Sequence, residues 1–109
     1  MKKEIIQELY NGFEAAAVEV EDIECWSARE LQLLLGYSKW ENFSKVIDKA
    51  KTACVNAGYL VSDHFPDVRK MVHLGSGSER EIDDILLTRY ACYLIAQNGD
   101  PRKEQIAFA

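Results

Sequence analysis

The side chains best suited to bind a polyanion lie in the middle third of the sequence. Residues 36–78 carry six lysines and arginines against four carboxylates, whereas residues 1–35 carry three against eight and residues 79–109 carry four against six. Because lysine and arginine bind phosphate groups, a polyanion site is expected in or beside the middle segment. A solvated helix face would produce the same pattern, and the sequence favours neither interpretation. The candidate contact residues are Lys39, Trp40, Lys45, Lys49, Lys70, His73, Ser76 and Arg80.

No arrangement of nucleophile, base or metal ligand stands out in the sequence. The glycine-rich stretch LGSGSER at 74–80 lacks the Lys-Ser/Thr pair of a P-loop, so a hairpin tip is the better interpretation. Ser27 precedes a helical pattern and is explained as its cap rather than as a nucleophile. Cys25, Cys54 and Cys92 are odd in number and far apart, which argues against a disulfide framework and a metal motif. We therefore predict no catalytic residue, no metal site, no cofactor and no enzymatic activity.

Length and composition place the chain among ordinary globular proteins. Its 109 residues, of which 48% are hydrophobic and 28% charged, fit one domain. No apolar run approaches the ~20 residues that a membrane helix needs, and the N-terminus lacks the apolar segment of a secretory signal. Cys54 and Cys92 lie among apolar residues and are expected to be buried thiols, which suits a reducing compartment. We expect a cytoplasmic protein without membrane contact. Its net charge of −5 counts against non-specific coating of DNA.

The first quarter of the chain predicts a helix followed by a small hairpin. Apolar residues spaced by three and four indicate a helix over 3–11, which Gly12 is expected to end. Residues 13–20 fit either a helix or a strand. The Glu21-Asp22 pair then indicates a turn between two short strands.

Two helices are predicted next. Ser27 and Glu30 match the S-x-x-E capping box, which predicts a helix that ends at Gly36. A longer helix is expected from residue 39 or 40 to residue 57, ended by Gly58. The remaining expected elements are a loop at 63–66, strands at 68–74 and 81–87 joined by a flexible tip at 75–78, a helix over 89–98 capped by Thr88, and a last helix from Arg102.

These elements predict an α+β fold, a small single domain of helices with one or two short antiparallel β-hairpins. The second predicted strand of the later hairpin also fits a helical period in part. Residues 1–25 would form the N-terminal helix and short strands, and residues 26–109 the main part of one compact domain. Because the last predicted helix stops with its apolar face barely developed, we expect a fragment that is truncated at its C-terminus.

Four aromatic residues are candidates for packing in the core or for exposure on the surface. Trp26 directly precedes the capped helix and is expected to close the core. Trp40 could stack on a base or sugar, but half-buried packing is the favoured interpretation. Tyr90 and Tyr93 are expected to divide between core and surface.

Two blocks of the sequence, in the order in which they occur, resemble the DNA-damage-inducible protein D family. The first is WSARELQLLLGY followed by WENF, within residues 26–43, and the second is LTRYACYLIAQNGDP at 87–101. The segment DKAKTACVNAGYLVSDHFPDV between them, with KMVHLGSG after it, is similar to the same family. The match covers about residues 26–109, and members of the family extend well past this C-terminus. The resemblance assigns no site residue by residue.

The resemblance implies a role in the bacterial SOS response, where family members are similar to modulators of the RecA recombinase filament. It also implies a domain remotely like BRO-N, the DNA-binding module of phage antirepressors. In such domains the expected order is hairpin, helix, helix, hairpin, helix.

Two functions remain open as hypotheses. In the first, the chain is a DNA-binding module whose helix lysines contact phosphates while the glycine-containing tip enters a groove like a wing. In the second, it is a protein-interaction or antirepressor-like regulatory domain that does not bind DNA directly. Its acidic first third would then dock on a basic partner, such as a recombinase filament. The sequence leaves open whether DNA would be bound as a single or a double strand.

Overall fold

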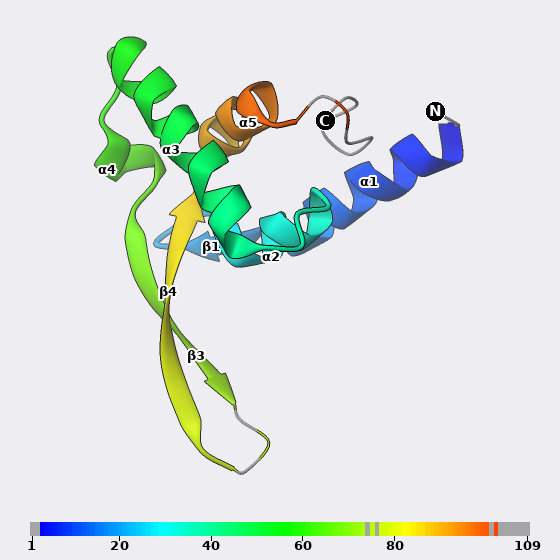
Figure 1. Ribbon diagram of the computed structural model, residues 1–109, viewed down its shortest axis with the longest axis vertical. Helices are drawn as coiled ribbons and strands as arrows, with labels where there is room; N and C mark the ends of the chain where they lie inside the picture. Colours follow the sequence, from blue (N-terminus) through cyan, green and yellow to red (C-terminus); the bar gives the residue numbers. More distant parts are fainter. Residues whose placement is uncertain (1–2, 74, 76, 101, 103–109) are drawn as a thin grey trace.

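The computed structural model describes residues 3–73, 75, 77–100 and 102, and it confirms the predicted α+β class. Helices and strands alternate irregularly along the chain, so that neither forms a separate half (Figure 1). The helices are α1 (Lys3–Ala16), α2 (Ala28–Leu34), α3 (Trp40–Asn56), α4 (Val61–His64) and α5 (Arg89–Asn98). The strands are β1 (Val18–Val20), β2 (Ile23–Ser27), β3 (Asp67–His73) and β4 (Glu79–Leu87).

The strands form an antiparallel sheet in the order β1-β2-β4-β3. Strand β4 is central because its end pairs with β2 while most of its length pairs with β3. The β3–β4 hairpin runs away from the helices, and its far end stands apart from the rest of the molecule (Figure 1). The whole of β4 is strand, and its partly helical sequence period is overridden by pairing along its length.

The core lies between α2, α3, α5 and the inner ends of β2 and β4. The apolar positions that predicted α3 are buried, and this helix packs against α5. Predicted burial is also confirmed for Trp26, Cys54 and Cys92. The largest fully buried side chains are Trp26, Leu31, Phe43, Ile47, Phe65, Leu87 and Ile95.

The first helix continues five residues beyond its predicted end, to Ala16. Gly12 does not stop it, because this glycine faces α2: an added Cβ would lie 3.4 Å from the Cδ2 atom of Leu34. The extension places Phe13 against Trp26, with the two rings stacked at a centroid distance of 4.3 Å. The Trp26 indole Nε1 also donates a hydrogen bond of 2.7 Å to the Phe13 carbonyl. A tertiary contact thus decides what the local sequence left ambiguous.

Two other predicted segments lie at residues 63–66 and from Arg102 onward. The segment predicted as a loop at 63–66 begins inside α4, a single helical turn that the short local pattern did not indicate. The helix expected from Arg102 falls almost wholly outside the described residues. Within those residues, none of the helices has the length and apolar character needed to span a bilayer.

The predicted turn between β1 and β2 is confirmed. Glu21 and Asp22 both adopt left-handed backbone angles, with φ of 51° and 66°. Such a two-residue turn matches the twist of a hairpin, but Asn-Gly adopts it at much lower cost than an acidic pair.

We therefore expect Glu21→Asn combined with Asp22→Gly to raise the free energy of unfolding by about 1 kcal/mol. Thermal denaturation followed by circular dichroism should show a melting temperature higher by about 4–8 °C. Glu19→Asn, in the neighbouring strand, is the control and should bring no gain. An unchanged melting temperature in the double variant would contradict the inference that the Glu21-Asp22 pair adopts this turn at a cost in free energy.

Candidate nucleic-acid interface

A buried carboxylate attaches the β3–β4 hairpin to the start of α2. Asp84, in β4, is 3% exposed. Its Oδ2 accepts a 2.5 Å hydrogen bond from the Ser27 hydroxyl, and its Oδ1 accepts bonds from the backbone N–H groups of Arg29 and Ile85. Ser27 is also the N-cap of α2, since its Oγ accepts from the Glu30 N–H. The predicted cap is therefore confirmed, and a distant carboxylate completes it.

Arg29 extends this anchor from the hairpin to α3. Its Nε donates a 2.8 Å hydrogen bond to the Asp83 carbonyl, and its guanidinium lies 4.2 Å from the centroid of the Trp40 ring. On the next residue, Glu30 pairs with the Lys70 ammonium at 3.9 Å. The first turn of α2 therefore contacts both the hairpin and the first residue of α3.

Trp40 is packed rather than open. It is half-buried against the core, and its ring centroid lies 6.1 Å from that of Phe43. Arg29 covers one face of the indole. Packing, the favoured expectation for Trp40, agrees with this placement, and a base could stack on the covered face only by displacing Arg29.

The α3 lysines point away from the core. Lys45 and Lys49 are exposed, one turn apart, on the side of α3 opposite Phe43 and Ala50. Lys39 is exposed just before the helix. Among the described residues, no carboxylate lies within 4.0 Å of these three ammonium groups.

Arg69 and Lys70, two of the three lysines and arginines of the hairpin, have carboxylate partners. Arg69 lies 3.2 Å from Glu81, and the His73 Nδ1 lies 3.4 Å from Glu79. Together β3 and β4 carry five acidic residues against three lysines and arginines. The hairpin is therefore acidic overall, and its Arg69 and Lys70 balance neighbouring carboxylates.

The eight candidate residues do not form one surface. The β3–β4 register places Lys70 opposite Ile82 and Arg80 opposite Val72, so Lys70 and Arg80 share a face and His73 lies on the other. The far end of the hairpin, near His73 and Arg80, stands away from α3 (Figure 1). Arg80 is exposed, and no carboxylate of the described chain lies within ion-pair distance of it. Ser76 lies outside the described residues.

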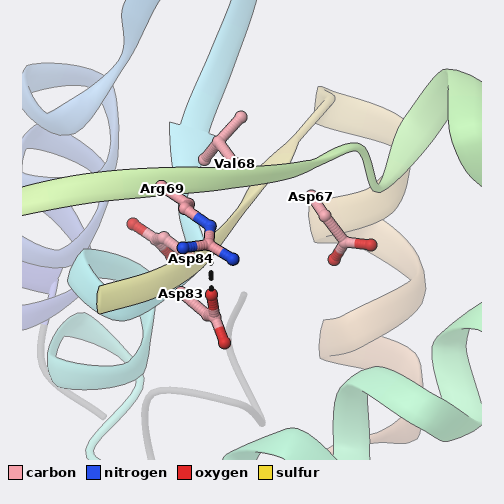
Figure 2. A pocket seen from close by; sticks show the side chains of 5 residues that line it. All are labelled: Asp67, Val68, Arg69, Asp83 and Asp84. Carbon is pink, nitrogen blue, oxygen red and sulfur yellow. Dashed lines mark ion pairs between the residues drawn. The ribbon is translucent and has the colours of Figure 1, made fainter. Parts of the chain in front are cut away.

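An open hollow beside the hairpin is unsuited to phosphate. It measures about 550 Å³ and is lined by Val68 and Arg69 together with three aspartates (Figure 2). Arg69 extends toward Asp83, with its Nε 3.9 Å from the carboxylate. The carboxylates outnumber the single guanidinium, so the local field repels anions.

The cysteines show no sign of activation. All three are free and buried, including Cys25, for which the sequence made no prediction of burial. Burial raises the pKa of the Cys25 and Cys54 thiols, and it raises the pKa of Cys92 to about 12. Thiols with raised pKa are weak nucleophiles at neutral pH, so they act here as small apolar core residues.

Arg29 and Asp84 were not among the candidate residues, although they fix how α3 and the hairpin are arranged. One signal was present in the sequence. Asp84 stands between Ile82 and Leu86 in an alternating strand, and a carboxylate at an inward position requires hydrogen-bond donors.

This combination of capped helices with a projecting hairpin corresponds to a known domain class: residues 15–109 match the BRO family N-terminal domain, and the chain belongs to that family. More particularly, the chain is 52% identical over 84 residues to DNA damage-inducible protein D of Escherichia coli (strain K12). The family resemblance predicted from the two sequence blocks is thereby confirmed. The aligned part is 77% of this chain and 31% of that relative, so the chain spans about a third of the relative's length. No solved structure matches the chain.

The anchor at Asp84 leads to a stability prediction. Asp84→Ala should lower the free energy of unfolding by about 3 kcal/mol, because it leaves a hydroxyl and two N–H groups without their acceptor. Asp83→Ala is the matched control, since the Asp83 side chain is 88% exposed and its carbonyl would still accept from Arg29. It should change the free energy by less than about 0.5 kcal/mol. Urea denaturation of both variants measures the difference, and equal losses would show that Asp84 is not a special anchor.

Proposed function

We propose that this chain is a non-catalytic, DNA-binding regulatory domain of the DNA-damage response, and that α3 supplies its main contacts with phosphate. Membership of the BRO family and similarity to a DNA damage-inducible protein support the regulatory role. The observation that carries the DNA contact is the outward face of α3. There Lys45 and Lys49 lie one turn apart, exposed and without a carboxylate partner among the described residues. Such ammonium groups bind phosphates without reading sequence.

The other candidates take secondary places in this proposal. Lys39 is an exposed cation just before α3, Arg80 is exposed toward the far end of the hairpin, and Ser76 stays a candidate from the sequence alone. Lys70 and His73 are assigned to the hairpin, because Glu30 pairs with Lys70 and Glu79 lies 3.4 Å from the His73 ring. Trp40 is assigned to positioning α3. Because lysine–phosphate contacts release counterions, binding should be strongest at low salt, and the overall charge of −5 opposes it.

Paired substitutions test the placement on α3. Lys45→Gln with Lys49→Gln should weaken DNA binding and flatten the plot of log affinity against log salt by about 1.8, since each neutralised phosphate contributes about 0.9. Arg69→Gln with Lys70→Gln removes the same charge from paired cations and should leave the slope unchanged. Fluorescence anisotropy with labelled DNA at several salt concentrations measures both.

The outcomes distinguish a wrong placement of the DNA contact on α3 from a chain that does not bind DNA. If both double variants weaken DNA binding equally, the loss comes from the change in net charge and not from the position of the lysines on α3. Unchanged binding by the α3 variant would remove these lysines from the interface. If the parent chain binds no DNA at low salt, the proposed DNA contact itself is refuted. Circular dichroism should show that both double variants fold like the parent.

A second candidate function rests on the distribution of acidic residues. The β1–β2 turn exposes Glu19, Glu21 and Asp22, and the β3–β4 hairpin is acidic as well. Acidic projections of this kind suit a basic protein surface, such as that of a recombinase filament. In this alternative the chain regulates by docking on protein and does not bind DNA directly.

Capture of RecA recombinase without nucleic acid tests the second candidate. The parent chain should retain the recombinase, and the combination of Glu19→Gln, Glu21→Gln and Asp22→Asn should release it, because the acidic turn loses its charge. Lys45→Gln with Lys49→Gln is the control and should still retain it. Failure of the parent chain to capture the recombinase would count against docking through this domain.

A further inference from the structure

Three rings from separate segments meet at the C-terminal end of α3. Tyr59 follows this helix, His64 ends α4 and Tyr90 lies in the first turn of α5. Their ring centroids lie 5.0 to 5.6 Å apart in all three pairs. Figure 1 shows α4 beside α3 and α5 packed behind it, in agreement with the contacts between these helices.

The inner rings of this cluster are held in place. His64 and Tyr90 are half-buried, and the His64 Nδ1 lies 2.7 Å from the Thr88 hydroxyl. That hydroxyl also accepts the Ala91 N–H and so caps α5. The two inner rings therefore form a fixed support for the ring above them.

The outer rings of this region are exposed to solvent. Tyr59 is 53% exposed, and Tyr93, one turn after Tyr90 on α5, is 58% exposed. Val55, in the last turn of α3, and Leu60, next to Tyr59 in the chain, are 59% and 65% exposed. Several large apolar side chains exposed in one region usually mark a binding surface rather than a requirement of the fold.

The helix that carries Lys45 and Lys49 ends beside the cluster. Lys49 precedes the last residue of α3 by seven positions, or about 10 Å along the helix axis. Gly58, with φ of +88°, then turns the chain, and the Tyr59 N–H donates a hydrogen bond of 3.1 Å back to the Cys54 carbonyl. Cations along a helix and exposed rings at its end are the two components with which proteins bind single-stranded nucleic acid. The bases of a duplex are paired and stacked, so they offer no face to such rings.

We propose that Tyr59, with Tyr93 beside the cluster, is a stacking site for unpaired bases, and that the domain therefore prefers single-stranded to double-stranded DNA. This inference rests on the proposed DNA contact through α3. Asp63, exposed in α4, brings a negative charge near the site. Its replacement by Asn should strengthen binding of the strand.

Substitution of the outermost ring tests the proposal. Tyr59→Leu keeps an apolar side chain but removes the ring, and it should raise the dissociation constant for labelled oligothymidylate about tenfold. The salt slope should stay unchanged, because no phosphate contact is lost. Tyr59→Trp should restore affinity, and its added fluorescence should be quenched when the strand binds.

Tyr10→Leu provides the matched control, since Tyr10 is 59% exposed on α1, a helix that packs against α2. It should bind the strand like the parent. A duplex of the same length should bind the parent more weakly, and Tyr59→Leu should not affect it.

The outcomes separate this site from the α3 contact. If Tyr59→Leu binds the strand as the parent does while the Lys45 and Lys49 variant loses its salt slope, the stacking site is refuted and the α3 contact stands. A duplex bound as tightly as the single strand would also refute the stated preference. If the parent binds neither form, the proposed function fails together with this inference.

Discussion

The hydrogen bonds accepted by the buried Asp84 carboxylate are the constraint on which the arrangement of this domain depends. An ionised carboxylate shielded from water is costly unless several donors surround it. Here the start of α2 supplies two of them, the Ser27 hydroxyl and the Arg29 N–H. Since β4 pairs with both β2 and β3, the same contact fixes the hairpin against the helices. Arg29 then carries the restraint on to Trp40, and so to the first turn of α3.

This anchoring also decides which charges are available to a ligand. The hairpin lies close enough to α2 for Lys70 to meet Glu30, and its register brings Arg69 beside Glu81. Those cations balance carboxylates of the chain itself. The lysines of α3 lie on the opposite side of their helix from the core and meet no such partner among the described residues. A chain that is acidic overall thus presents, along this face of α3, two neighbouring lysines whose charge no described carboxylate balances.

The sequence predicted those features that depend on neighbouring residues. The caps at Ser27 and Thr88, the buried stripe of α3 and the Glu21-Asp22 turn follow from spacing and turn chemistry. Features that depend on distant partners could not be predicted in this way. Asp84 meets a hydroxyl 57 positions away, and Gly12 continues a helix because α2 packs against it. The faces of Lys70 and His73 depend on strand register, and a shift of one residue would exchange them.

The two sides of α3 separate stability from recognition. Phe43, Ile47 and Cys54 face the core and are essentially inaccessible to solvent, so changes there would alter folding. Lys45 and Lys49 make no contact that the fold requires, so changes there should alter binding alone. Trp40 and Arg29 belong to neither group, because they connect the helix to the hairpin anchor. Loss of DNA binding after substitution of Trp40 would therefore be ambiguous between a lost contact and a displaced helix, whereas the lysines allow a direct interpretation.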